Sequence, residues 1–194
     1  MSTSYQIVEQ NELHFVTFQI IHWIDIFTRQ LYRDIVIDNL RFCQQNKGLE
    51  IYAFVIMSNH IHLILRSPDN KLSNIIRDFK SFTSKKIITA IHEITESRKK
   101  WLINLFELKT KKHQRNDQFQ VWTHDNHAEI LYQNQFIDQK VRYIHNNPVR
   151  AGIVIHPEDY LYSSARSYAG FEGVLEIIPI INSIEKKPFM RTLR

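Results

Sequence analysis

Residues 49–66 read LEIYAFVIMSNHIHLILR, and this stretch decides the fold. The runs over 49–57 and 60–66 are rich in β-branched and aromatic residues, which is typical of strands. Only Ser58 and Asn59 stand between them, and a two-residue connection predicts a tight antiparallel hairpin. An antiparallel sheet is therefore the expected centre of the molecule.

The flanking sequence predicts the order β-α-β-β-α. A strand over 12–21 and a helix over 27–46 precede the hairpin. A helix over 71–95 follows it, and the apolar residues of that helix fall on one stripe, as an amphipathic packing face requires. This order predicts an α+β fold, a ferredoxin-like sandwich with an antiparallel sheet and helices packed on it.

The second half of the chain predicts shorter elements. We expect an exposed basic loop over 107–118, a short strand over 119–122, a helix over 134–147 stopped by Pro148, and a helical piece over 160–168. Residues 171–194 are apolar but irregular, and they can add a further strand. We expect residues 1–170 to form one domain and residues 171–194 to be a C-terminal extension of unknown role.

Composition sets the class of protein. The 194 residues suit one domain, and the single cysteine, Cys43, excludes an intramolecular disulfide. Twenty-five lysines and arginines against 20 acidic residues give a net charge of +5, which suits an anionic partner. No apolar run is long enough to span a membrane, and the first residues lack the pattern of a signal peptide, so we expect a cytoplasmic protein without a membrane partner.

Two histidines share one face of the second hairpin strand. His60 and His62 are two residues apart, so their side chains point the same way while that of Ile61 points to the other face. Two adjacent imidazoles can chelate a divalent metal, although a third ligand must then come from elsewhere. A surface pair or a hydrogen-bonded buried pair is the alternative.

A second candidate cluster lies on the helix over 134–147. Tyr143 and Asn147 are four residues apart and so share a helical face. The tyrosine can act as a covalent nucleophile, and the asparagine amide oxygen can bind a metal. Core packing of Tyr143 and helix capping by Asn147 are the alternatives. His145 falls on a different face, so we do not assign it as a base.

Basic and aromatic residues elsewhere can contact nucleic acid. Arg77, Lys80 and Lys85 lie roughly opposite the apolar stripe of their helix, where cations can hold phosphates. Trp122 can stack on an unpaired base. A solvated basic face and a buried tryptophan are the corresponding alternatives.

Three segments carry a resemblance to a known family. Residues 57–62 read MSNHIH, residues 143–152 read YIHNNPVRAG, and residues 157–168 read PEDYLYSSARSY. They resemble, in this order, the M-P-N-H-x-H, Y-I-H-x-N-P-V-x-x-G and P-x-D-[WY]-x-x-S-S segments of the REP-associated tyrosine transposases, in the single-tyrosine HUH transposase superfamily. The resemblance extends from about residue 5 to residue 168, with Ser58 where proline is more usual.

The resemblance implies a ferredoxin-like catalytic domain and a divalent metal, Mg²⁺ or Mn²⁺. It implies His60 and His62 as metal ligands, Asn147 as the third ligand and Tyr143 as the nucleophile. The implied substrate is single-stranded DNA, often a hairpin at a repeat end, which is nicked and transferred through a 5′-phosphotyrosine intermediate. Arg142, beside the nucleophile, is a further expected DNA contact. The family includes monomers and homodimers.

Two other functions stay open on the sequence. The first is a non-catalytic module that binds single-stranded nucleic acid, which predicts binding without a covalent adduct. The second is a metal-dependent nuclease that uses activated water, which predicts cleavage that survives the loss of Tyr143.

Overall fold

The computed structural model describes residues 7–108 and 119–180. Its strands are β1 His14–Gln19, β2 Glu50–Ile56, β3 His60–Arg66 and β4 Glu129–Ile130. Its α-helices are α1 Gln30–Lys47, α2 Leu72–Glu93, α3 Lys99–Leu108, α4 Asn134–Arg150 and α5 Ala165–Tyr168. Short 3₁₀ turns lie at Ile21–Trp23, Ile26–Thr28 and Pro157–Asp159.

One sheet runs through the molecule in the order β2-β3-β1-β4, and all its neighbouring strands are antiparallel. The predicted hairpin forms, because the Met57 N–H donates to the His60 carbonyl at 2.8 Å across Ser58 and Asn59. The prediction of a ferredoxin-like α+β sandwich is confirmed.

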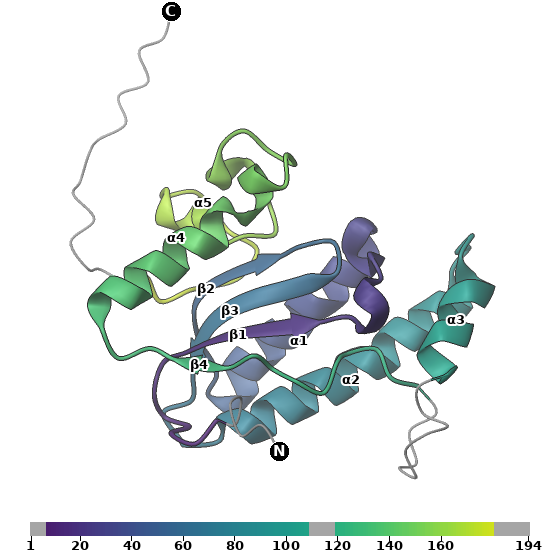
Figure 1. Cartoon of the computed structure of the whole chain (residues 1–194), viewed down its shortest axis with the longest axis horizontal. Coiled ribbons are helices and arrows are strands. Elements are labelled where there is room, and N and C mark those ends of the chain that lie inside the picture. The colour runs from purple at the N-terminus through teal and green to yellow at the C-terminus, as the bar shows by residue number, and fades with distance from the viewer. Residues whose placement is uncertain (1–6, 109–118, 181–194) are drawn as a thin grey trace, which may run out of the picture.

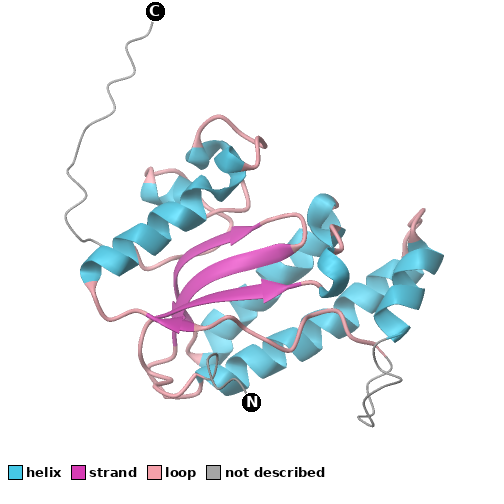
Figure 2. Cartoon of the chain, in the orientation of Figure 1, coloured by secondary structure: helices cyan, strands magenta, loops and turns pink. Residues whose placement is uncertain are grey.

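Helices cover both faces of this sheet. Figure 1 shows α1 and α2 together on one face and α4 on the other, where it packs over β2 and β3. Figure 2 shows the same three layers by element type. Because strand side chains alternate between faces, Ile61 and Leu63 of β3 enter the core under α1 and α2, whereas His60 and His62 face the α4 side.

The segment after residue 118 lies along the free side of β1. Ile20 and Trp122 form a single antiparallel bridge, and the Thr123 N–H donates to the Gln19 carbonyl at 2.8 Å. The strand predicted over 119–122 is thus one bridge only, and the regular pairing comes later, at β4, which the sequence did not predict.

Other predicted boundaries are also corrected. The chain is helical in α3 up to Leu108, so the loop predicted over 107–118 starts two residues too early, and the rest of it, residues 109–118, lies outside the described part. The predicted stop at Pro148 is wrong, because α4 continues to Arg150 and the Ala151 N–H donates to the Asn147 carbonyl at 3.0 Å. A proline so near the end of a helix removes a single N–H from the ladder. The helical piece predicted over 160–168 is shorter, Ala165–Tyr168.

The described part of the C-terminal extension packs on the domain. Leu175 is buried, and the Ile178 N–H donates to the Ile51 carbonyl of β2 at 2.9 Å. Residues 181–194 lie outside the described part. Within the described residues, no helix combines the length and apolar character needed to cross a membrane.

Candidate functional site

The two histidines of β3 stand side by side on the α4 face of the sheet. Their ring centroids are 4.6 Å apart. In the antiparallel register His62 is opposite Thr17 of β1, and His60 is opposite Gln19. Strand alternation predicts that the two histidine side chains share one face of the sheet, and the structure confirms this.

His62 is fixed in position and has one nitrogen free. Its Nδ1 lies 2.8 Å from Thr17 Oγ1, and its Nε2 is buried with no hydrogen-bond partner among the described residues. Burial, and then the proximity of His60 and Lys140, lowers the pKa of His62 to about 3. The ring is therefore neutral near pH 7, and in the tautomer in which Nδ1 donates to Thr17, Nε2 keeps a lone pair for a further partner.

His60 is oriented in the same way by a neighbour. The Asn59 amide nitrogen donates to the Trp23 carbonyl at 3.2 Å, so its Oδ1 accepts from His60 Nδ1 at 2.7 Å. Burial also lowers the pKa of His60. A histidine that donates through one nitrogen to a fixed acceptor presents the other nitrogen as a ligand, which is how metal-binding imidazoles are usually held.

Tyr143 comes from α4 to meet this pair. Its ring centroid is 5.2 Å from that of His62, at an angle of 64°. Phe15 of β1 stacks on His62 at 5.4 Å and 22° and also contacts the Tyr143 ring, edge to face, at 6.1 Å. The Tyr143 side chain keeps 38% of its surface exposed. The structure thus brings together the tyrosine and histidines singled out from the sequence, within one chain.

Three more residues share the Tyr143 face of α4 at helical spacing. Asn147 is one turn on, and its Nδ2 donates to the Tyr143 carbonyl at 2.9 Å, which leaves the amide oxygen for another partner. The guanidinium carbon of Arg150 is 5.9 Å from the Tyr143 ring, and Lys140 Nζ lies 4.4 Å from the Phe15 ring. Sequence reasoning missed Lys140 and Arg150, although their offsets of −3 and +7 from Tyr143 were a usable signal.

The donor set fits a divalent metal ion. The buried, unpartnered Nε2 of His62 is an orphan that a metal would satisfy, and His60 is held in a matching orientation. Within the described residues no group of three His, Cys, Asp or Glu side chains could complete a site. The remaining ligands must therefore be of another kind, such as the Asn147 amide oxygen, water or phosphate oxygens.

His145 faces away from this site and anchors α4. Its Nε2 lies 2.8 Å from Ser164 Oγ, and its ring contacts Tyr168 at 4.8 Å. Burial lowers the pKa of His145 to about 4. Ser164 is in turn bound to β2, because its Oγ accepts the Phe54 N–H at 2.9 Å. The histidine and serine of the family segments therefore tie the Tyr143 helix to the sheet.

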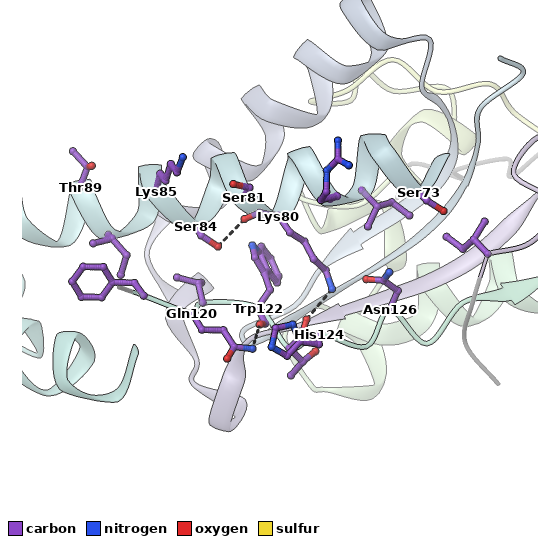
Figure 3. Close-up of a pocket in the computed structure, with 17 residues that line it drawn as sticks. Ser73, Lys80, Ser81, Ser84, Lys85, Thr89, Gln120, Trp122, His124 and Asn126 are labelled. Carbon is purple, nitrogen blue, oxygen red and sulfur yellow. Dashed lines mark hydrogen bonds between the residues drawn. The ribbon is translucent and has the colours of Figure 1, made fainter. Parts of the chain in front are cut away.

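The other predicted DNA contacts lie mostly on the opposite side of the sheet. A groove of about 950 Å³ runs between α2 and residues 119–126 (Figure 3). Lys80 crosses it, and its Nζ donates to the carbonyls of Thr123 at 2.9 Å and Asp125 at 3.3 Å. Burial lowers the pKa of Lys80 to about 8. This lysine is a tether between two segments, which corrects both the prediction that it contacts DNA and the alternative of a solvated basic face.

Trp122 also has a structural place. It is 3% exposed, its Nε1 donates to Thr83 Oγ1 at 2.9 Å, and its ring packs on Phe27 and Phe79. The prediction that it stacks on a base is wrong, because no face of the indole is open.

The last three cations predicted to contact DNA are exposed. Arg77 and Lys85 lie on α2, where Arg77 pairs with Asp78 at 3.0 Å, and Arg142 lies on α4 next to Tyr143. Their contacts with DNA stay predictions.

Two solved structures are similar to this chain. A solved structure described as a REP-associated tyrosine transposase bound to a REP hairpin is 18% identical, covers 93% of this chain and 96% of its own, and has a TM-score of 0.58. A second, a putative transposase from Deinococcus radiodurans R1, is 17% identical, covers 75% of this chain and 97% of its own, and has a TM-score of 0.41. No curated protein matches.

The family profile described as "Transposase IS200 like" matches residues 8–147, a span that includes both histidines of β3, Tyr143 and Asn147. The resemblance drawn from the three sequence segments is thereby confirmed, and the chain belongs to the IS200-like transposases.

Proposed function

We propose that this transposase nicks and rejoins single-stranded DNA through a covalent bond to Tyr143. The observation that carries the proposal is the contact of the Tyr143 ring with His62, whose Nε2 is buried and has no hydrogen-bond partner in the described part of the chain. The nucleophile and the ligand pair lie on one face of the sheet and come from one chain. A monomer is therefore sufficient for the chemistry, and we expect it to act in the cytoplasm.

The metal site is proposed at His60 and His62, with Asn147 as the third protein ligand. Both imidazoles are neutral near pH 7 because burial lowers their pKa values, so they bind without losing a proton. Mg²⁺ or Mn²⁺ held there supplies Lewis-acid polarisation of a bound phosphate.

The proposed reaction uses the phenol of Tyr143 as the nucleophile. Tyr143 Oη attacks the phosphorus, the bond from phosphorus to the 3′ oxygen breaks, and the proton lost by the phenol is balanced by the one gained at the 3′ hydroxyl. The product is a 5′-phosphotyrosine, and attack by another 3′ hydroxyl reverses the step and joins a new strand. Arg150, over the Tyr143 ring, neutralises charge on the phosphate, and Lys140, over the Phe15 ring and paired with Glu129, adds to the positive charge nearby.

The substrate is proposed to be unpaired DNA next to a hairpin at a repeat end. The solved relative described above holds a REP hairpin, and the net charge of +5 suits a polyanion. Arg142, beside the nucleophile, and Arg77 and Lys85 on α2 are the proposed backbone contacts.

The test is a denaturing gel of the full chain with hairpin oligonucleotides that carry random single-stranded flanks, with Mn²⁺. We expect a covalent protein–DNA band when the 3′ end of the DNA is labelled and no such band when the 5′ end is labelled. Tyr143→Phe should remove the band and keep DNA binding, while Tyr132→Phe, an exposed tyrosine outside α4, should keep both.

Each alternative predicts a different gel. Metal-dependent cleavage that persists in Tyr143→Phe without an adduct would indicate the water-using nuclease. Binding with neither cleavage nor adduct in the wild-type protein would indicate the non-catalytic module. Either result rejects the proposal.

A further inference from the structure

An unusual turn follows β1 beside the histidine pair. His22 and Trp23 both have φ of 56°, the left-handed region that bulky residues seldom adopt. Neither is glycine or asparagine, so this backbone is strained, and strain of this kind persists only where the surroundings hold it. The turn is held by two hydrogen bonds to the hairpin connection, from Ile20 N–H to the Asn59 carbonyl and from Phe27 N–H to the Ser58 carbonyl, each 2.9 Å.

The turn presents a tryptophan to solvent at the edge of the site. Trp23 is 64% exposed, whereas Trp122 is 3% exposed. The indole nevertheless stands next to a proposed metal ligand, because its ring centroid is 6.4 Å from that of His60 at an angle of 75°. Backbone strain of this kind gathers at binding and active sites, and its place beside His60 favours a role of the exposed ring in binding.

One side chain, that of Asn59, links the Trp23 backbone to the His60 imidazole. The Asn59 amide donates to the Trp23 carbonyl at 3.2 Å and accepts from His60 Nδ1 at 2.7 Å. Movement of Trp23 therefore disturbs the orientation of His60, and a ligand on one is positioned relative to the other.

We propose that Trp23 is a stacking platform for the unpaired base adjoining the phosphate that Tyr143 attacks. This inference rests on the proposed function, because it takes the phosphate to lie at the histidine pair. A base in single-stranded DNA is tethered to its phosphate, and exposed aromatic rings bind such bases through their π-faces with little dependence on sequence. Trp23 fixes where along the strand the phosphate stops.

The experiment measures binding in the Tyr143→Phe background, which prevents cleavage. Trp23→Asn removes the ring and suits a positive φ, so the turn keeps its shape. With a fluorescently labelled single-stranded dT 20-mer, we expect Trp23→Asn to weaken binding about tenfold and Trp23→Phe to stay within about threefold of the parent. Phe42→Ala, which removes an exposed aromatic from α1 on the other face of the sheet, should leave binding unchanged.

A second arm separates stacking from a merely structural effect. Once the wild-type adduct has located the cleaved bond, an abasic residue is placed on either side of it in turn. At one position the missing base should weaken binding of the parent and have no further effect on Trp23→Asn, since the partner of the base is already absent.

The two proposals fail differently. The stacking role is overturned if Trp23→Asn and its parent bind DNA with equal affinity. It is also overturned if the abasic residue lowers the affinity of both proteins by the same factor. In either case the Tyr143 adduct of the wild-type protein still stands. Absence of both adduct and DNA binding in the wild-type protein would overturn the two together.

Discussion

At the scale of the residue, the properties of His62 depend on one threonine. Thr17 Oγ1 is the partner of His62 Nδ1, and this bond sets which nitrogen faces the site. Thr17→Val keeps the size and the β-branched shape and removes the bond. We expect Mn²⁺ affinity, measured by calorimetric titration, to fall about 10–100-fold. Thr28→Val is the control, because Thr28 bonds the exposed Asp25 carbonyl away from the ligands; equal Mn²⁺ affinities of Thr17→Val and wild type would show that the hydroxyl does not orient the ligand.

The residues of the site differ in how well the sequence could predict them. His60 and His62 follow from strand alternation, which depends only on the local backbone, and the structure keeps them on one face. Trp122 could not be placed in this way, because whether an indole is buried depends on the Thr83, Phe27 and Phe79 contacts made by distant segments. The turn that exposes Trp23 could not be predicted either, because two adjacent residues other than glycine adopt the left-handed region against their local preference.

At the scale of the element, the register of α4 on the sheet decides where Tyr143 lies. Ser164 Oγ is 2.8 Å from His145 Nε2 and accepts the buried Phe54 N–H at 2.9 Å. A shift of α4 by one residue would turn Tyr143 about 100° away from His62. The Ser164 contacts therefore help to set the position of Tyr143 relative to His62, although Ser164 itself is not part of the site.

Ser164→Ala should weaken this link. It leaves the buried Phe54 N–H and His145 without their partner, so we expect the free energy of unfolding in urea to fall by about 1–3 kcal/mol. Adduct formation should also slow in single-turnover experiments. Ser84→Ala, which loses only a bond to the Lys80 carbonyl on its own helix, should change stability by less than about 0.5 kcal/mol. If Ser164→Ala keeps the wild-type free energy of unfolding and the wild-type rate of adduct formation, α4 is held by its apolar contacts alone.

Elements with strong periodicity were predicted well, and elements that depend on neighbours were not. The stripe of α2 and the alternation of β3 are properties of the local sequence, and both form close to the predicted bounds. The two-residue β4 exists only because β1 offers a free edge to pair with. The proline rule failed in α4, because a single missing N–H near the C-terminus is outweighed by packing of the buried Pro148 ring.

At the scale of the whole molecule, Lys80 joins α2 to the segment along β1 and makes stability depend on pH. Its pKa is lowered to about 8 by burial, against the opposing influence of Asp125. Between about pH 8 and the ordinary lysine value of 10.5, the unfolded chain holds a proton that the folded protein has released. The free energy of unfolding due to Lys80 therefore rises as the pH rises through this range.

Comparison with Lys80→Met isolates this contribution, because the raised pKa values of Tyr32 and Cys43 act in the opposite direction in both proteins. Urea titrations at pH 7.5 and pH 10 give the free energy of unfolding of each protein. The value for the wild type minus the value for Lys80→Met should be larger at pH 10 than at pH 7.5. A difference that stays constant would mean that Lys80 keeps its proton in the folded state.

The packing of residues 171–180 against β2 has a further consequence. The outermost strand of a sheet exposes unpaired amides and carbonyls that invite other chains to add on. Here residues 162–164 pair with the later part of β2, and the Ile178 N–H donates to the Ile51 carbonyl near its start, so the protein's own chain covers this edge. Removal of residues 171–180 would therefore uncover the start of β2 alone and leave that part of the edge available for strand addition by another copy.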